Sequence, residues 1–217
     1  MQPSPIAVSV LMAVYNTDFN LVTRAIDSVL GQTYQNFELI IVDDGSDNAL
    51  SRKIVAYCDL HAHKITYLKH KNCGQSESIN RAVRLSAGQY IAIIDSDDEY
   101  KSNHLAACMH EMDSADLISS ITETVTDNYR DFFVPDKDDH QIDIHVDDCI
   151  LFATLFGKRV VFETLVFKNM YAADSDFYAM ASEEFVVRKV NLRTYIYYRN
   201  VANSTSAVLK RAQMELV

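Results

Sequence analysis

The chain has 217 residues, of which 48% are hydrophobic, and its 30 acidic and 20 basic side chains give a net charge of −10. This length and apolar fraction suit one sizeable core, so we expect residues 1–217 to form a single domain. The acidic balance argues against a nucleic-acid partner, since such a surface neutralises phosphates with clustered cations.

The first half of the chain alternates buried strands with helices. The apolar, β-branched run 6–14 predicts a strand that is covered on both faces. Asp18 can cap the next helix, whose apolar residues recur at three and four residues until Gly31 ends it. The same signals predict further strands at 37–42, 64–68 and 90–94, and helices at 49–60, 76–85 and from 103. We expect Gly88 to close the helix at 76–85 with a positive φ.

The second half of the chain is less regular. An acidic, polar stretch at 122–148 predicts loops, and shorter signals predict strands at 160–167 and 194–198, a helix at 174–182 and a last helix from Ser206. Strands that alternate with helices form a mainly parallel sheet with helices on both faces. We therefore expect an α/β fold with a smaller, irregular C-terminal layer.

Cysteine, histidine and hydropathy patterns indicate a reduced, soluble protein. The four cysteines lack paired CxxC spacing, which favours free thiols, and the seven histidines have no fixed ligand geometry, which favours surface positions. No apolar run approaches the roughly 18 to 20 residues that cross a bilayer, and the N-terminus lacks a signal-peptide pattern. We expect a cytoplasmic location. Attachment to a longer polypeptide, or peripheral association with the inner face of a membrane, stays open.

Acidic and polar residues follow three of the predicted strands. Tyr15-Asn16 follow the first strand, Asp43-Asp44 the second, and the run from Asp95 to Asp98 the fourth. Ligands of open α/β sheets bind beyond the carboxyl ends of the strands. Because no glycine-rich phosphate loop follows any of these strands, we expect carboxylates to bind phosphate through a cation.

The sequence Asp95-Ser96-Asp97 is the best candidate for such a cation site. Its two carboxylates are hard oxygen ligands of the kind that Mg²⁺ and Mn²⁺ prefer, and the metal would neutralise a departing diphosphate. For an isolated DxD, helix capping or solvation of a turn explains the carboxylates equally well. The position after a buried strand favours the metal site.

Four motifs follow one another in the first hundred or so residues: VSVLMAVYN at 8–16, SVLGQTY at 28–34, FELIIVDDGS at 37–46 and GQYIAIIDSDD at 88–98. Together they resemble the GT-A glycosyltransferases of family 2. The resemblance implies a Rossmann-like GT-A fold, with a nucleotide-sugar-binding half at 1–115 and an acceptor-side half at 116–217. It also implies inverting transfer from a nucleoside diphosphate sugar, with Mn²⁺ or Mg²⁺ as cofactor.

The resemblance also assigns expected roles to individual residues. Tyr15 and Asp44 match positions that hold the uracil or another base, and Asp43 supports the turn. Asp97 matches the principal metal ligand, Asp95 a position near the ribose and the metal, and Gly74 and Arg81 a loop and helix over the diphosphate. For Arg81, a solvated helix face is an equally good interpretation. The remaining expected donor-site residues are Ala13, Asn16 and Ser96.

The resemblance places the catalytic base at Asp174. In an inverting transferase this base deprotonates the acceptor hydroxyl, whose oxygen attacks the anomeric carbon opposite the diphosphate. Residues 173–177 are similar to a Glu-Asp-x-Asp-hydrophobic segment of the family. Helix capping is the alternative role for Asp174, since Asp is favoured at helix starts.

Departures from the family pattern keep a second hypothesis open. Ala13 stands where Pro or Thr is common, Ala173 replaces a Glu, and Val201 stands where a metal-binding His is usual, with Asn200 as a weak substitute. The chain is therefore either an active hexosyl- or N-acetylhexosaminyltransferase or a catalytically silent domain that binds a nucleotide or a partner. For the active enzyme we expect a UDP-sugar donor and a saccharide or glycolipid acceptor, in synthesis of surface polysaccharide or glycoconjugate. A response-regulator domain is disfavoured, because the acidic sites follow two different strands.

Overall fold

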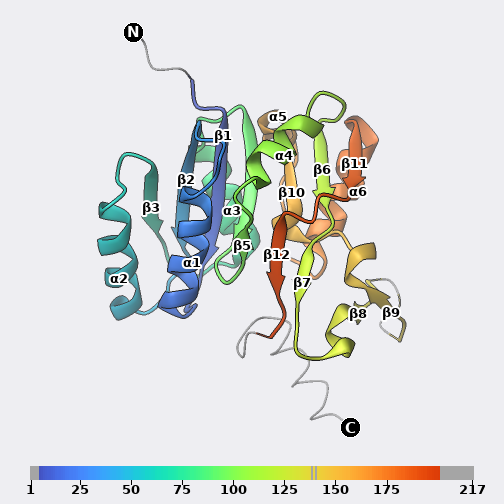
Figure 1. Cartoon of the computed structure of the whole chain (residues 1–217), viewed down its shortest axis with the longest axis horizontal. Coiled ribbons are helices and arrows are strands. Elements are labelled where there is room, and N and C mark those ends of the chain that lie inside the picture. The colour runs from blue at the N-terminus through green and yellow to red at the C-terminus, as the bar shows by residue number, and fades with distance from the viewer. Residues whose placement is uncertain (1–4, 138, 140, 201–217) are drawn as a thin grey trace.

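A seven-stranded sheet runs through the computed structural model, which describes residues 5–137, 139 and 141–200 (Figure 1). Its strands are β1 (Val8–Val14), β2 (Phe37–Asp43), β3 (Ile65–Lys69), β4 (Tyr90–Asp95), β6 (Leu117–Ser120), β10 (Leu155–Lys158) and β11 (Val187–Val190). They lie in the order β11-β6-β10-β4-β1-β2-β3. Strands β1 to β4 are parallel, whereas β10 is antiparallel to both β4 and β6. The sheet is therefore mainly parallel, as expected.

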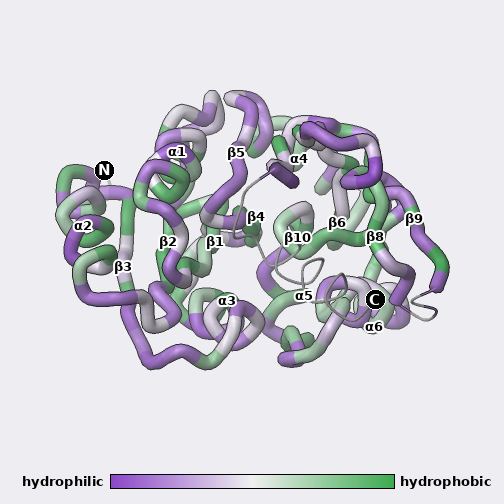
Figure 2. Tube along the Cα trace, turned by 90° about the horizontal axis from the view of Figure 1, so that it is seen from below, coloured by the Kyte–Doolittle hydropathy of each residue, from purple (hydrophilic) through white to green (hydrophobic). Residues whose placement is uncertain are grey.

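Helices cover both faces of this sheet. They are α1 (Phe19–Leu30), α2 (Asn48–Asp59), α3 (Gln75–Leu85), α4 (His104–Glu111), α5 (Arg159–Thr164) and α6 (Ala173–Glu184). Helices α1 and α4 lie on one face, and α3 and α5 lie on the other (Figure 2). Helix α2 packs beside α1 and β3, and α6 packs on β11. The three-layer arrangement confirms the α/β class.

Local sequence explains why these elements form where they do. Six of the seven residues of β1 are buried, as a strand covered on both faces requires. In α1 the buried residues recur at helical spacing, and the Asp18 side chain accepts a hydrogen bond from the N–H of Asn20 at 2.8 Å. Asp47 caps α2 in the same way through the N–H groups of Ala49 and Leu50.

The strand order reverses at β1, and this reversal positions the candidate site. The chain passes from β1 through β2 to β3 on one side and then returns to place β4 on the other side of β1. Val14 lies opposite Asp43, and Ala13 lies opposite Asp95. The carboxyl ends of β1, β2 and β4 therefore meet at one edge of the sheet, at a topological switch point where open α/β sheets bind ligands.

The second half of the chain is more ordered than the sequence predicted. It adds β6, β10 and β11 to the main sheet and forms two small sheets. One contains β5 (Glu99–Tyr100), β12 (Tyr195–Tyr198) and β7 (Glu123–Val125), and the other contains β8 (Phe133–Pro135) and β9 (Asp143–His145). Short 3-10 turns lie at Tyr129–Phe132, Val146–Asp148 and Phe152–Thr154. The predicted loop region 122–148 thus contains a small hairpin.

The strand predicted at 160–167 is wrong, because this segment is mostly helix α5 and the strand β10 precedes it. Val161 and Phe162 are buried, whereas Val160 is 51% exposed, so the apolar run does not lie flat in a sheet. Arg159 and Glu163, four residues apart, form an ion pair at 3.2 Å across one helical turn. The apolar run was therefore a helix with one buried stripe.

Gly88 has a different role from the predicted helix closure. Helix α3 ends at Leu85 with Ser86 as its C-cap, and Gly88 is not among the residues with positive φ. A Cβ on Gly88 would lie 2.5 Å from the backbone N of Ser9. The glycine is thus needed because β1 passes so close. The predicted helix from Ser206 and Val201 both lie outside the described residues.

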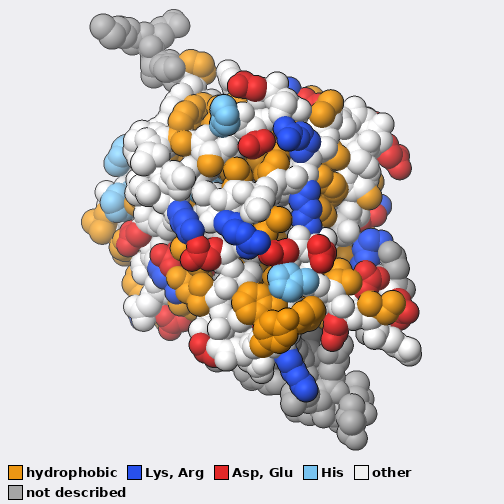
Figure 3. Space-filling model, turned by 45° about the vertical axis from the view of Figure 1, so that its right-hand side comes forward, with side chains coloured by type: hydrophobic (Ala, Val, Ile, Leu, Met, Phe, Trp, Pro, Cys, Tyr) orange, Lys and Arg blue, Asp and Glu red, His pale blue; other side chains and the backbone are white. Residues whose placement is uncertain are grey.

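Charged side chains of both signs are interspersed on the surface drawn in Figure 3. Lys and Arg alternate there with Asp and Glu, and apolar side chains lie between them. That face therefore carries a mixed charge pattern. Within the described part of the chain, no helix is both long enough and apolar enough to span a bilayer.

Candidate functional site

Carboxylates from distant parts of the sequence gather at the switch point. Asp95 ends β4, Asp97 follows it, and Asp174 lies in the first turn of α6. Burial, together with the negative charges of Asp97 and Asp174, raises the pKa of Asp95 to about 7. Burial also raises the pKa values of Asp97 and Asp174. The fold therefore brings the DxD motif and Asp174 into one acidic cluster.

Neighbouring side chains hold the DxD motif in place. The Gln75 Nε2 group donates a hydrogen bond to Asp95 Oδ1 at 2.7 Å. The hydroxyls of Thr17 and Ser96 are 2.7 Å apart, which joins the loop after β1 to the loop after β4. Arg24 donates to the backbone carbonyl of Asp97, so the carboxylate of Asp97 is not consumed by this contact. The two DxD carboxylates are thus positioned by neighbours that leave most of their oxygen sites open.

Asp98 has a structural role. It is 1% exposed, and its Oδ2 accepts a hydrogen bond from the Tyr195 hydroxyl at 2.7 Å while its Oδ1 accepts one from the N–H of Tyr198 at 2.8 Å. Both contacts tie the end of β4 to β12. Tyr195 is itself 1% exposed, so it packs in the core. Asp98 therefore anchors the second half of the chain beside the DxD motif.

Asp43 supports the turn after β2. Its fully buried carboxylate accepts hydrogen bonds from the Ser46 N–H at 2.7 Å, the Ser51 hydroxyl at 2.5 Å and the Tyr67 hydroxyl at 2.6 Å. Burial raises the pKa of Asp43, but these hydrogen bonds outweigh burial and lower it below the ordinary value of 3.8. Asp43 is therefore an ionised support inside the protein and does not face a ligand.

The neighbouring Asp44 orders the loop that precedes α3. Its two oxygens accept hydrogen bonds from the N–H groups of Cys73 at 2.7 Å and Gly74 at 2.9 Å. Gly74 has φ = 95°, and a Cβ there would lie 2.8 Å from Asn169 Oδ1, so both conformation and space require glycine. The loop is thereby held against the end of β2.

Tyr15 and Asn16 form the loop after β1. Asn16 adopts φ = 50°, which asparagine tolerates, and its Oδ1 accepts a hydrogen bond from the N–H of Asp47 at 2.9 Å. The N–H of Asn16 in turn donates to Ser46 Oγ at 3.0 Å. Tyr15 is 54% exposed. Asn16 therefore joins two strand-end loops, and the ring of Tyr15 is open to a ligand.

Arg81 and Ala13 lie at the margin of the site. The Arg81 Nε donates to Glu77 Oε1 at 2.9 Å on the same face of α3, and the pair is more than a third exposed. This geometry matches the solvated helix face more closely than a phosphate contact. Ala13 lies in β1 directly opposite Asp95.

Asp174 does not cap α6. The N-cap position is Ala172, with φ = 53°, and it makes no side-chain capping bond. Asp174 Oδ1 accepts a hydrogen bond from the N–H of Ser175 at 2.8 Å, and burial raises the pKa of its carboxyl group despite this bond. The nearby Asp176 pairs with Lys168 at 3.0 Å. The capping explanation for Asp174 therefore loses its geometric support.

The DxD carboxylates fit a hard divalent cation. Burial raises the pKa values of both carboxyl groups, and a bound cation stabilises buried carboxylates in the ionised form. Asn200, the expected substitute ligand, directs its amide Nδ2 to Asp127 Oδ2 at 3.2 Å. Asp95 and Asp97 can thus supply carboxylate oxygens to a divalent metal at this edge of the sheet.

His70 and Cys73 lie beside Asp44 and were missed in the sequence. His70 Nδ1 is 3.5 Å from Asp44 Oδ1 and 3.4 Å from Cys73 Sγ. Both residues follow the third strand of the chain, which ends at Lys69, so the rule that ligands bind beyond strand ends points to them as it does to Asp44 and Asp95. His104 is also buried, at 2% exposure, and hydrogen-bonds Thr194. The expectation of surface histidines fails at these positions.

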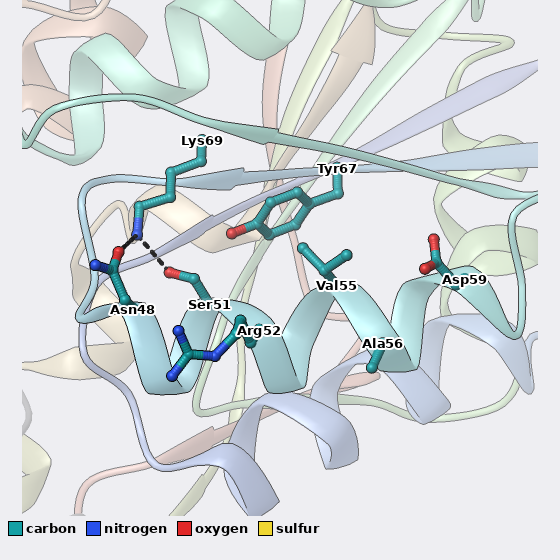
Figure 4. Close-up of a pocket in the computed structure, with 8 residues that line it drawn as sticks. All are labelled: Asn48, Ser51, Arg52, Val55, Ala56, Asp59, Tyr67 and Lys69. Atoms are coloured by element: carbon teal, nitrogen blue, oxygen red, sulfur yellow. Dashed lines mark hydrogen bonds between the residues drawn. The ribbon is translucent and has the colours of Figure 1, made fainter.

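A hollow of about 470 Å³ lies between α2 and β3, on the edge strand of the sheet (Figure 4). Strands β1 and β2 separate it from β4 and the DxD motif. Ser51 and Tyr67, which bind Asp43, are part of its wall, and Lys69 Nζ donates to Ser51 Oγ at 2.6 Å. The full lining is Asn48, Ser51, Arg52, Val55, Ala56, Asp59, Tyr67 and Lys69. The hollow thus lies behind the turn that Asp43 supports and not at the acidic cluster.

Known sequences that resemble this chain are glycosyltransferases. The family described as "Glycosyl transferase family 2" matches residues 9–162. A protein named "Uncharacterized glycosyltransferase" from Rickettsia bellii is 37% identical over 115 residues, which are 53% of this chain and 16% of that protein. Glycosyltransferase GlyG from Streptococcus pneumoniae is 33% identical over 127 residues, which are 58% of this chain and 40% of that protein. This chain therefore spans well under half of either relative.

Two solved structures share the fold. TarS from S. aureus, in complex with UDP-GlcNAc, has a TM-score of 0.72 and 18% identity, and the match covers 93% of this chain and 61% of that one. The mannosyltransferase PcManGT from Pyrobaculum calidifontis, in complex with GDP-Man and Mn²⁺, has a TM-score of 0.74 and 18% identity, with 98% and 62% covered. The sheet described above is therefore that of the GT-A fold.

Proposed function

The chain belongs to glycosyl transferase family 2, and from this premise we propose that it moves a sugar from a nucleoside diphosphate sugar to an acceptor hydroxyl with inversion. One observation carries the proposal: Asp95, Asp97 and Asp174 converge at the switch point of the sheet, although they come from separate parts of the sequence. A metal site and a base at one edge are the two groups that this reaction needs.

Asp97, with Asp95, holds Mn²⁺ or Mg²⁺ in this proposal. When bound, the cation neutralises the charge that develops on the departing diphosphate. The structure of PcManGT with GDP-Man and Mn²⁺ supports a divalent metal in a protein of this fold. Ser96 and Asn16 shape the neighbouring loops through Thr17 and Ser46.

Tyr15 and Asp44 hold the base of the donor. The exposed ring of Tyr15 offers a stacking surface, and Asp44 offers a hydrogen-bond acceptor at the end of the adjacent strand. We favour a UDP-sugar, in line with the UDP-GlcNAc bound by TarS, and the GDP-Man bound by PcManGT makes a guanine donor the alternative. The N–H of Gly74 donates to Asp44 Oδ2 at 2.9 Å, which keeps the loop before α3 close to this end of the site.

Asp174 is the proposed base. Its carboxylate takes the proton of the acceptor hydroxyl as that oxygen forms a bond to the anomeric carbon, and the bond from this carbon to the diphosphate oxygen breaks. The nucleoside diphosphate leaves with the electron pair of that bond. The raised pKa of Asp174 makes its carboxylate a stronger base than an ordinary aspartate. The acceptor is proposed to be a saccharide or glycolipid of surface polysaccharide or glycoconjugate synthesis.

A panel of nucleotides and nucleotide-sugars, measured by thermal shift with and without Mn²⁺, tests the binding half of the proposal. A specific ligand raises the melting temperature by mass action, and we expect UDP and a UDP-sugar to do so only with the metal. Asp97→Ala should lose this metal-dependent shift. Equal shifts in wild type and variant would remove Asp97 as the metal ligand.

Turnover of the preferred donor tests the catalytic half. We expect hydrolysis or transfer with wild type, which releases the nucleoside diphosphate. Metal-dependent binding without any turnover would instead support the catalytically silent domain. The silent-domain hypothesis is based on Ala173, which stands in place of the family Glu.

A further inference from the structure

Three different side chains of the kinds that bind metals meet at the nucleobase end of the proposed donor site. They are Asp44, from the end of β2, and His70 and Cys73, from the loop between β3 and α3. One ligand atom from each lies within 4.8 Å of the other two. A carboxylate, an imidazole and a thiol at one point form the mixed donor set that zinc accepts.

The two distances from His70 within this cluster match those around a tetrahedral ion. His70 Nδ1 is 3.4 Å from Cys73 Sγ and 3.5 Å from Asp44 Oδ1. Zinc bonds of about 2.0–2.1 Å to nitrogen, 2.3 Å to sulfur and 2.0–2.2 Å to oxygen, at tetrahedral angles, place nitrogen about 3.6 Å from sulfur and about 3.4 Å from oxygen. His70 Nδ1 also lies close to the carbonyl oxygen of Lys71, so the imidazole ring must turn away from that oxygen for a metal to enter.

Neighbouring groups orient two of the three ligands, Asp44 and His70. Asp44 is fixed by hydrogen bonds from the backbone N–H groups of Cys73 and Gly74. His70 Nε2 lies 3.2 Å from Ser78 Oγ, whose own hydrogen bond goes to the carbonyl of Gly74. In the metal-free protein the Nδ1–H of His70 donates to the Lys71 carbonyl oxygen at 2.8 Å. The zinc-bound form takes the other tautomer, in which Nε2–H donates to Ser78 Oγ and the Nδ1 lone pair faces the metal. Metal-binding histidines are commonly held by such a hydrogen bond on the second ring nitrogen.

We propose that Asp44, His70 and Cys73 form a site for Zn²⁺, separate from the DxD motif. Binding takes the proton from the Cys73 thiol to solvent, and water completes the tetrahedron. The two sites differ in ligand chemistry. Thiolate and imidazole favour zinc, whereas the carboxylates of Asp95 and Asp97 favour Mn²⁺ or Mg²⁺.

The zinc site regulates donor binding, an inference that rests on the proposed function. Asp44 is proposed to accept a hydrogen bond from the nucleobase, and its carboxylate is less available for that bond while it is a zinc ligand. Zinc therefore competes with the nucleotide. Tyr15 follows β1, which lies beside β2 in the sheet. A metal at Asp44 therefore occupies the nucleobase end of the site and leaves the DxD end free.

Cobalt provides a direct probe of the site, because Co²⁺ replaces Zn²⁺ and a thiolate bound to Co²⁺ gives a charge-transfer absorption. We titrate the reduced full chain with Co²⁺ and then displace it with Zn²⁺, without nucleotide. Wild type should show the band, and Cys73→Ser should lose it. Cys149→Ser, which alters another half-buried thiol, is the matched control and should keep the band. Absence of the band in wild type, or its survival in Cys73→Ser, overturns the proposal.

Two further variants separate metal coordination from nonspecific thiol binding. Ser78→Ala should weaken zinc binding about 10–100-fold, as is typical when a residue that orients a ligand is removed. Asp97→Ala should leave the cobalt band unchanged, because the DxD carboxylates are not part of this site. A band that keeps its affinity in Ser78→Ala but is lost in Asp97→Ala would contradict the assigned ligand set and overturn the proposal.

Competition is measured separately. UDP affinity at saturating Mn²⁺ should fall when Zn²⁺ is added to wild type and stay unchanged in Cys73→Ser. An unchanged affinity in wild type with the cobalt band present would overturn the regulatory part. A protein that shows the cobalt band but binds no nucleotide under any metal condition would instead contradict the proposed function and leave the zinc site standing.

Discussion

The acidic cluster should destabilise the metal-free protein, and neutralising one carboxylate should reveal this. The change is Asp95→Asn, which removes the negative charge and keeps a side-chain oxygen to accept the hydrogen bond from Gln75. Asp95 is the best choice because burial and the charges of Asp97 and Asp174 all raise its pKa. We expect the metal-free variant to be more stable than wild type at neutral and alkaline pH.

The pKa shift sets the size and the pH window of this effect. A rise from 3.8 to about 7 corresponds to roughly 4 kcal/mol for ionising Asp95 in the folded state. Part of this penalty is shared with its charged neighbours, so we expect a gain of about 1–4 kcal/mol. Folded Asp95 retains its proton to higher pH than the unfolded chain does. The wild-type protein therefore loses stability as pH rises from about 4 to about 7, and the variant lacks that loss.

Urea unfolding in the presence of a chelator measures the effect. Circular dichroism is the suitable probe, because the chain has 12 tyrosines and no tryptophan. Asp113→Asn, at an exposed position after α4, is the control and should change little. With Mn²⁺ at about 100 times its Kd, wild type should gain about 2.7 kcal/mol, which narrows or reverses the difference from Asp95→Asn.

The opposite results would refute the reasoning. If Asp95→Asn were less stable than wild type at pH 8 without metal, Asp95 would be a supporting group like Asp43 and not a strained one. A difference that stays constant from pH 4 to pH 8 would also contradict the account, because it would show that ionisation of Asp95 is not the cause.

Three further substitutions test other parts of the structure. Asp174→Asn should keep donor binding in a titration and lower transfer by about 10²–10⁴-fold, and retained transfer would remove Asp174 as the base. Tyr67→Phe removes a hydrogen bond to ionised, buried Asp43 and should lower the free energy of unfolding by about 1.5–3 kcal/mol at pH 7. This difference should shrink as pH falls below 3.8 through the lowered pKa of folded Asp43, and a difference independent of pH would argue against the bond. Gly88→Ala should lower the free energy of unfolding by about 1–3 kcal/mol, because the added Cβ meets the backbone of Ser9. The melting temperature should fall accordingly, and an unchanged melting temperature would show that β1 can shift.

The first half of the fold could be predicted because its signals are local and agree with one another. Strand β1 is apolar along its whole length, and Asp18 and Asp47 cap the helices that follow β1 and β2. The DxD motif lies directly after a strand of the same kind. Each element thus carries its own pattern, and the parallel order of the sheet follows from their alternation.

The second half could not be predicted in the same way because its strands are short and depend on tertiary contacts. Leu117–Ser120 ends in two serines, yet all four residues are buried, and the Ser119 hydroxyl pairs with that of Thr154 at 2.9 Å. Gly157 lies in β10, where a Cβ would be 2.6 Å from the carbonyl oxygen of Asp116. Polar and glycine residues within buried strands hide the usual apolar signal.

The candidate site shows the same division. The positions of Asp44 and Asp95 at strand ends followed from the sequence pattern, because strand ends of a parallel sheet meet at one edge. The approach of Asp174 to Asp95 depends on how α6 packs against the second half of the chain, which no local pattern encodes. The cluster of His70 and Cys73 against Asp44 likewise depends on the path of the loop after β3.

Anomalous diffraction from a crystal soaked with Mn²⁺ and UDP tests the central claim most directly. The account predicts a manganese peak within bonding distance of a carboxylate oxygen of Asp97, with the uracil between Tyr15 and Asp44. A crystal with UDP bound and no manganese at Asp95 or Asp97, or with those two carboxylates turned away from the nucleotide, would contradict the proposal that a cation held by β4 binds the diphosphate.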